Sequence, residues 1–173
     1  VETISKNVGF REITIDGSIF KVNGIAVKLR GVNMLNVYGN DGECYDFEVE
    51  KKFLETAKAN NINYIRAAHF PRSTEFLDLC DQMGIFVEQE NAVAFVSSPV
   101  QSDEDFYFPN IIHNVSEMVE KDRSHPSIVI WSVANESQWG SNMEKFSQYI
   151  KDVNPSIPTK FSWGGQIPAN SCV

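Results

Sequence analysis

From residue 29 onward, short apolar runs alternate with amphipathic segments, and this alternation restricts the possible folds more than any other feature of the sequence. Segments 62–69, 85–90, 127–135 and 159–165 read as strands, and helical periodicity fills the intervals between them. The run at 127–135 (SIVIWSVAN) is largely apolar, as is typical of a parallel strand buried on both faces. The pattern predicts a parallel sheet covered by helices.

Two of the expected helices are bounded by residues that commonly begin and end helices. Asp46 is a predicted N-cap for a helix that runs to about residue 60, and Ser73 is a predicted N-cap for a helix that Gly84 ends. Further helices are expected from about 105 to 124 and over 141–153.

The first residues follow a different pattern. Short β-branched runs are separated by turn signals at Gly17 and at Asn23-Gly24, which predicts antiparallel strands. We therefore divide the chain into an N-terminal β segment, residues 1–24, and an α/β region, residues 25–173.

Parallel α/β chains form either an open doubly wound sheet or a (β/α)8 barrel. A dinucleotide-binding sheet is disfavoured because no glycine fingerprint follows any strand. Barrel active sites are built at the C-terminal ends of several strands. Polar or aromatic residues follow the strand ends here: Asn33, Arg66 with His69, Glu88 with Glu90, Asn135 with Glu136, and Trp163. The prediction is a partial TIM barrel of about five strands, preceded by a short β segment.

The net charge and the apolar content of the chain argue against several classes of partner. The formal net charge is −8 and the pI is about 4.9, without a Lys/Arg cluster, so neither nucleic acid nor an anionic membrane would be attracted. No apolar stretch approaches the roughly 20 residues that cross a bilayer. The three cysteines lack metal-ligand spacing, and Cys80 is expected to be a buried thiol.

Asn135 and Glu136 stand side by side where the apolar strand 127–135 ends. A carboxyl group there, near Trp139 and beneath aromatic side chains, would be partly desolvated, which disfavours its charged form. Such a group can protonate a leaving oxygen and later deprotonate water. The alternative is that Glu136 merely caps the following helix and Asn135 ends a strand.

The segment RSHPSIVIWSVANES (123–137) closely resembles the acid/base strand of glycoside hydrolase family 2, the β-galactosidase, β-glucuronidase and β-mannosidase family. LRGVN (29–33) resembles the first barrel strand of that family, and residues 60–91 resemble its second strand, second helix and third strand. NPSIPTKFSWGG (154–165) is similar to the fifth strand and its lead-in. The resemblance covers about residues 8–165 with its motifs in the correct order.

The resemblance implies a role for each candidate residue. Glu136 would be the general acid/base, and Asn135 would hydrogen-bond the sugar 2-hydroxyl. His69 would line the sugar subsite, or be an ordinary loop histidine. Arg66 would lie under the active centre and keep the nucleophile ionised, or form a barrel-core ion pair. Trp163 would stack on a sugar face or serve packing alone.

Two further residues receive structural roles from the resemblance. Glu90 matches an acid on the third strand of the family, where a structural part is expected. His125 is expected to anchor the turn before the fourth strand and to have no catalytic role.

The chain departs from the family pattern in its loops. The family often continues GVN with Arg-His-Glu, whereas Met34-Leu35-Asn36 stands here. The large β-galactosidases place Mg²⁺ ligands after the third strand, where this chain has the apolar AVAFV (92–96), so no metal and no cofactor is expected. The sugar and the linkage are left open, and a periplasmic or secreted location is favoured by family analogy only.

Retaining hydrolysis also needs a nucleophilic carboxylate, which this family carries on its seventh strand. No Asp or Glu follows Asp152, and Glu88 and Glu90 do not match that position. We expect an excised part of a retaining β-glycosidase, β-galactosidase-like and inactive alone. Its exposed strand edges near 29–33 and 159–165 are expected to dimerise, to pair, or to be covered by the N-terminal hairpin.

Two rival functions remain open. The chain could be a non-catalytic carbohydrate-binding module, although binding alone does not require a proton donor at Glu136. It could also be an unrelated structural α/β protein, in which Glu136 and His69 would face different cavities.

Overall fold

The computed structural model describes residues 2–3, 5, 7–37, 42 and 45–162. The strands are β1 (Ile13–Asp16), β2 (Ile19–Val22), β3 (Ile25–Ala26), β4 (Gly31–Met34), β5 (Tyr64–Ala67), β6 (Phe86–Glu90), β7 (Ile128–Asn135) and β8 (Thr159–Ser162). The helices are α1 (Phe47–Ala59), α2 (Thr74–Met83), α3 (Pro99–Asp103), α4 (Phe108–Asp122) and α5 (Ser141–Val153). Among the described residues, no helix combines the length and apolar character needed to cross a membrane.

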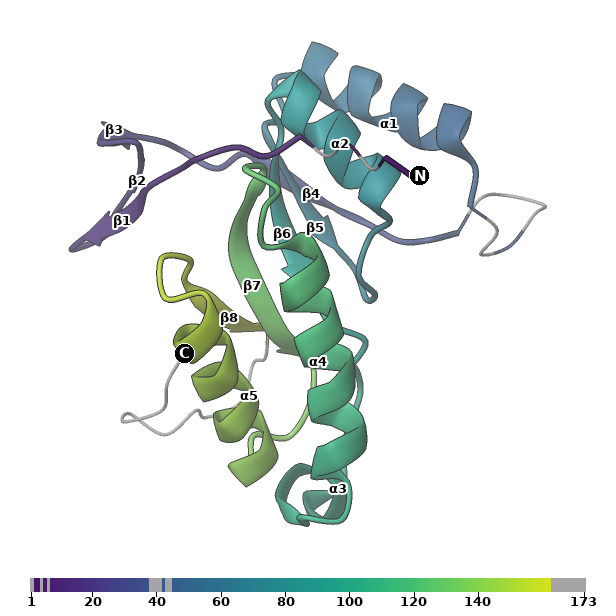
Figure 1. The fold of residues 1–173 in the computed structure, drawn as a ribbon, viewed down its shortest axis with the longest axis vertical. Coiled ribbons are helices and arrows are strands. Elements are labelled where there is room, and N and C mark those ends of the chain that lie inside the picture. Colours follow the sequence, from purple (N-terminus) through teal and green to yellow (C-terminus); the bar gives the residue numbers. More distant parts are fainter. Residues whose placement is uncertain (1, 4, 6, 38–41, 43–44, 163–173) are drawn as a thin grey trace.

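The larger sheet has five parallel strands in the order β4-β5-β6-β7-β8, which is also their order along the chain (Figure 1). At least one helix connects each consecutive pair of strands in this sheet, and right-handed crossovers in one continuing direction place those helices on one face of the sheet. The other face is left to line the inside of a barrel. The predicted α/β class, with about five strands of a TIM barrel, is confirmed.

Helix boundaries follow the capping residues expected from the sequence. The Asp46 side chain accepts hydrogen bonds from the backbone N–H groups of residues 48 and 49, and the Ser73 side chain accepts one from Phe76. Gly84 ends α2 in the left-handed conformation, with φ of 66°. The short helix α3 is the one described helix that the periodicity did not predict.

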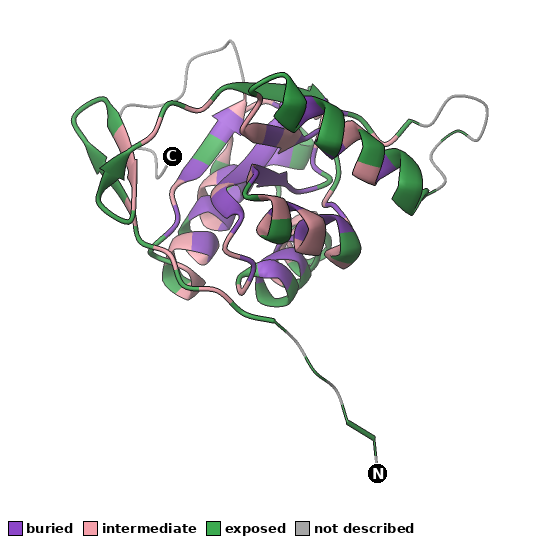
Figure 2. Ribbon diagram, turned by 90° about the horizontal axis from the view of Figure 1, so that it is seen from above, coloured by how far each residue is buried: buried purple, intermediate pink, exposed green. Residues whose placement is uncertain are grey.

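The hydrophobic core lies between the sheet and its helices. Each central strand turns alternate side chains toward the helices, as Ile65, Val87 and Trp131 do, and all three are fully buried. The predicted burial of β7 on both faces is confirmed, as is that of the Cys80 thiol. Figure 2 shows the buried residues concentrated in the central strands and on the inner sides of the helices.

The N-terminal strands form a separate three-stranded antiparallel sheet in the order β1-β2-β3. The small sheet projects from the main body (Figure 1), and its outer residues, such as Ile25, are exposed (Figure 2). Just before β1, the Arg11 Nε atom donates to the Ile128 carbonyl at the start of β7, at 2.5 Å. A division of the chain between residues 24 and 25 stays a prediction, and the small sheet itself runs to Ala26.

Strands β4 and β8 are the two ends of the five-stranded order, so each has one side without a partner strand among the described residues. The first three residues of β4 are exposed, including Val32. The expected exposure of an edge near residues 29–33 is confirmed. On β8 the described edge ends at Ser162, because residues 163–165 lie outside the described part of the chain.

Candidate active site

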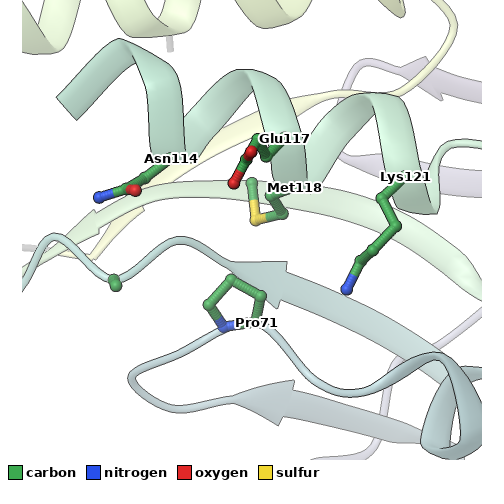
Figure 3. A pocket seen from close by; sticks show the side chains of 6 residues that line it. Pro71, Asn114, Glu117, Met118 and Lys121 are labelled. Carbon is green, nitrogen blue, oxygen red and sulfur yellow. The ribbon is translucent and has the colours of Figure 1, made fainter. Parts of the chain in front are cut away.

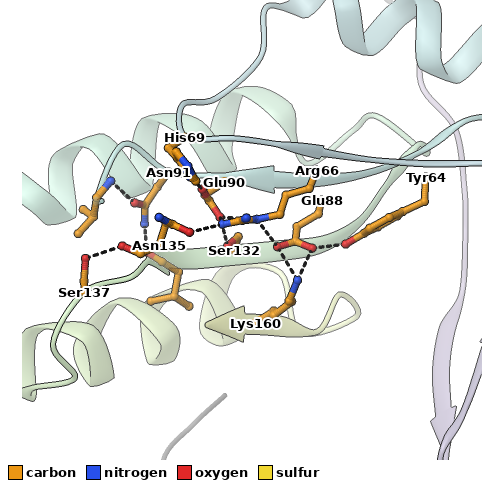
Figure 4. Close-up of polar contacts among 12 residues, drawn as sticks. Tyr64, Arg66, His69, Glu88, Glu90, Asn91, Ser132, Asn135, Ser137 and Lys160 are labelled. Atoms are coloured by element: carbon orange, nitrogen blue, oxygen red, sulfur yellow. Dashed lines mark hydrogen bonds and ion pairs between the residues drawn. The ribbon is translucent and has the colours of Figure 1, made fainter. Parts of the chain in front are cut away.

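The inner face of the five-stranded sheet carries a polar network that runs along the strands (Figure 4). Because β5 and β6 are parallel and pair Arg66 with Glu88, both side chains face the same way. The network divides into two groups, and Arg66 joins them. The lower group surrounds Glu88, and the upper group surrounds Glu90, nearer the C-terminal strand ends.

Glu90 is the hub of the upper group, and its side chain is fully buried. Its Oε2 atom accepts hydrogen bonds from Arg66 Nη2 at 2.6 Å and from Ser132 Oγ at 2.6 Å. Its Oε1 atom lies 2.7 Å from His69 Nδ1. One carboxylate therefore fixes the orientation of a cation, a hydroxyl and an imidazole from three different chain segments.

Glu88 is the hub of the lower group and is also fully buried. Lys160 Nζ lies 2.8 Å and 3.1 Å from its two carboxylate oxygens, and the Tyr64 hydroxyl donates to it. Burial, followed by the negative charge of Glu88, raises the pKa of Tyr64 well above its ordinary value. A pocket of about 470 Å³ opens here, lined in part by Tyr64, Arg66, Glu88 and Lys160.

Asn135, the last residue of β7, is held by the upper group. Its Oδ1 atom accepts a hydrogen bond from Arg66 Nη2 at 2.7 Å. Its Nδ2 atom is buried and has no hydrogen-bond partner among the described residues. A buried amide donor without a partner is costly, so this N–H group is available to a ligand oxygen.

Glu136 follows directly and has an exposed side chain. Its backbone is left-handed, with φ of 40°, and its N–H donates to the Ser162 carbonyl at 2.7 Å. The expected partial desolvation of this side chain is wrong, because the residue is exposed. The Trp139 ring packs against Phe161, with centroids 5.0 Å apart. The helix-cap alternative is also wrong, since α5 begins at Ser141 with Gly140 as its N-cap.

The structure brings Arg66, His69 and Asn135 together around Glu90, and Glu136 extends from the same strand end. Arg66 forms ion pairs with both Glu88 and Glu90, as its alternative role in a barrel-core ion pair requires. Trp163 lies outside the described residues. His69 and the Asn135–Glu136 pair share one end of the sheet, and this disfavours the structural alternative, in which Glu136 and His69 would face different cavities.

Sequence reasoning missed several residues that build this site. Ser132 contacts Glu90 and Lys160 contacts Glu88, so they complete the two groups. Their sequence signal is their place in the strands: Ser132 pairs with Glu90 across β6 and β7, and Lys160 pairs with Ser132 across β7 and β8. Asn91 binds the Val93 N–H through Oδ1 at 2.7 Å and donates to the Val133 carbonyl, so it fixes the turn after β6. The sequence signal available for Asn91 was its position as a polar residue directly after the buried strand β6.

His125 lies before β7, at the opposite end of that strand from Glu136. Its Nδ1 atom is 2.7 Å from Asp81 Oδ2, and the Ser127 N–H donates to Asp81 Oδ1 at 2.8 Å. Burial alone would raise the pKa of Asp81, but these hydrogen bonds hold it below the ordinary value. Although Asp78 is also near, the group serves to anchor this turn, as expected from the sequence.

A second pocket, of about 290 Å³, lies between α4 and the loops that follow β5 and β6 (Figure 3). Its wall is formed by the residues Pro71, Ala92, Asn114, Glu117, Met118 and Lys121. None of these residues belongs to the polar network of Figure 4, so this pocket is separate from the candidate active site.

Parallel strands in sequential order, with carboxylate, cation and amide groups near their C-terminal ends, define the chain as a protein of the TIM-barrel class. The family model of the glycosyl hydrolases family 2 TIM barrel domain matches residues 13–170, so the chain belongs to this family. The predicted family is confirmed.

Relatives with known names agree with this assignment. "Beta-galactosidase 2" of Enterobacter cloacae is 32% identical over 168 residues, which cover 95% of this chain and 16% of that protein. A β-galacturonidase of the same family from Eisenbergiella tayi superposes with a TM-score of 0.81 at 27% identity, over 90% of this chain and 29% of that one. The β-D-glucuronidase of Dictyoglomus thermophilum shares the fold, with a TM-score of 0.81 at 22% identity over 91% of this chain and 30% of that one. The chain spans about one sixth of the length of its curated relatives.

Proposed function

We propose that this chain supplies the acid/base half of the active site of a retaining β-glycosidase, and that the nucleophile comes from residues outside these 173. The proposed substrates are terminal β-glycosides, with β-galactosides first because the relative that is 32% identical is named a β-galactosidase. The chain alone is then expected to be inactive. Its small share of the length of these relatives supports this part of the proposal.

One observation carries the proposal: the unpartnered Asn135 Nδ2 donor stands directly before the exposed carboxyl group of Glu136. In the proposed reaction the Glu136 proton passes to the glycosidic oxygen while the C1–O bond breaks and the nucleophile bonds to C1. Glu136 then takes a proton from water, whose oxygen bonds to C1 and releases the enzyme carboxylate. Asn135 Nδ2 would donate to the sugar 2-hydroxyl oxygen.

The remaining side chains have supporting parts in this proposal. His69 lines the sugar subsite, and Glu90 fixes its ring through Nδ1. Arg66 holds Asn135 in place and would keep an adjacent nucleophile ionised. Neither Glu88 nor Glu90 suits the nucleophile role, because both carboxylates are fully buried and already paired. Trp163 stays a proposed sugar contact.

A panel of nitrophenyl α- and β-glycosides tests the proposal, applied both to the chain and to the full-length protein that carries it. We expect the full-length protein to hydrolyse a β-glycoside and to form the β-anomer first, as proton NMR would detect. The chain alone is expected to release no nitrophenol. Release of the α-anomer, or full turnover by the chain alone, would overturn the proposed mechanism.

A non-catalytic carbohydrate-binding module is the second candidate, and the buried amide donor of Asn135 favours it equally. It predicts sugar binding without turnover by the full-length protein. Comparing wild type with Glu136→Gln separates the two, because the substitution should abolish turnover in an enzyme and leave sugar binding largely in place in both cases.

A further inference from the structure

We infer that Phe95 forms the wall of the leaving-group subsite, and that the site favours β-glycosides with an apolar, aromatic leaving group over disaccharides. This inference rests on the proposed function and adds the class of leaving group to it. It depends on how the loop after β6 is attached to the strand end that carries Glu136.

Backbone hydrogen bonds fasten the loop after β6 to the end of β7. The Phe95 N–H donates to the Asn135 carbonyl at 3.0 Å, and Ala94 pairs with Asn135 in a parallel bridge. One residue further, the Val96 N–H donates to Ser137 Oγ at 3.1 Å. The backbone of Phe95 is thus held beside the backbone that positions the proton-donating carboxyl group.

The conformation of Phe95 is unusual for its residue type. Four described non-glycine residues have positive φ: Asn23, Asn61, Phe95 and Glu136. Asparagine tolerates this region, whereas a bulky residue at φ of 60° is strained. Strained backbone persists where the surroundings fix it and gathers at functional sites. Phe95 and Glu136 therefore form a pair of strained residues at one strand end.

The Phe95 ring gains little from burial, since the residue is 60% exposed. Its ring meets the His69 ring edge to face, with centroids 5.4 Å apart. His69 in turn contacts the fully buried Glu90. The exposed fraction increases from Glu90 through His69 to Phe95. Phe95 therefore lies beyond the side chains proposed to hold the sugar, where a leaving group would emerge.

The chemistry of the wall selects the leaving group. Residues 92–96 read AVAFV and offer no side-chain hydrogen-bonding group, and the nearby loop after β5 carries the half-exposed Phe70. An aromatic leaving group can stack or pack edge to face against Phe95. A second sugar would find few side-chain hydrogen-bond partners on this wall, so it gains less from the contact than an aromatic leaving group does.

The test compares the full-length wild type with Phe95→Ala, using the sugar that the nitrophenyl panel identifies. The substrates are its phenyl β-glycoside and a β-linked disaccharide of the same sugar. We expect Phe95→Ala to lower kcat/KM for the phenyl glycoside by about tenfold, mainly through KM, and to change the value for the disaccharide less than about twofold. Phe95→Leu should retain part of the preference, because it keeps an apolar wall.

Phe10→Ala is the matched control. Phe10 is 94% exposed and follows Gly9, whose N–H contacts the Ser124 carbonyl at the opposite end of β7 from Glu136, so kcat/KM should not change for either substrate. Equal losses on both substrates with Phe95→Ala would overturn this inference and leave the proposed function standing. If wild type hydrolyses no glycoside, the proposed function fails, and this inference fails with it.

Discussion

Glu90 offers the sharpest stability test, because one buried carboxylate holds three partners on the inner face of the sheet. Glu90→Gln keeps the volume but removes the charge that Arg66 and His69 contact at 2.6 Å and 2.7 Å. Removing one partner of a buried ion pair typically costs about 3–5 kcal/mol. Since Glu88 still lies 3.3 Å from Arg66 Nε, we expect the lower end, about 3 kcal/mol.

The assay is equilibrium unfolding in urea, followed by the fluorescence of tryptophans that include the fully buried Trp131. For a chain of this length, a loss of about 3 kcal/mol corresponds to a fall in Tm of roughly 6–12 °C. Glu117→Gln is the matched control, because the Glu117 side chain is 69% exposed and forms an ion pair with the exposed His113, so a change below about 0.5 kcal/mol is expected. A Glu90→Gln protein within about 0.5 kcal/mol of wild type would refute the reasoning about the hub.

Two further predictions concern the turn before β7 and the open sheet edges. The pKa of Asp81 is lowered in the folded state, so its interactions stabilise the fold above the unfolded value near 4, and this contribution is lost as pH falls through the lower folded value. Urea unfolding at several pH values should therefore show wild type more stable than Asp81→Asn at neutral pH and the difference shrinking below about pH 4; a constant difference would contradict this. In the described part of the chain, β4 and β8 each have one side without a partner strand, which should make the isolated chain self-associate. Sedimentation equilibrium should then show mass rising with concentration, whereas a monomer throughout would contradict the prediction.

Much of the fold could be predicted because local signals and global architecture agree. Asp46, Ser73 and Gly84 act at their helix ends as their chemistry suggests. The apolar run before Asn135 is a fully paired central strand, and right-handed crossovers then leave few possible arrangements. The end of the small N-terminal sheet, at Ala26, does not follow from the sequence, because turn signals alone do not fix where strand pairing ends.

The site was only partly predictable from the sequence. The residues at strand ends, such as Asn135 and His69, were found because parallel strands bring their C-terminal ends together. Ser132 and Lys160 were missed because their roles depend on inward register, which a two-residue period cannot assign to the inner or the outer face of a barrel. The exposure of Glu136 was also missed, since the sequence does not fix whether the residue after a buried strand faces the protein or the solvent.

The central claim is that Glu136 moves the proton, and sodium azide rescue of Glu136→Ala in the full-length protein tests it most directly. We expect hydrolysis of a methyl β-glycoside to fall by about 10²–10⁴-fold, because its leaving group needs protonation. A dinitrophenyl β-glycoside, which needs little protonation, should still react in the first step, and azide should then accelerate turnover and yield the β-glycosyl azide. Equal losses on both substrates with no azide product, or unchanged hydrolysis of the methyl glycoside, would contradict the account.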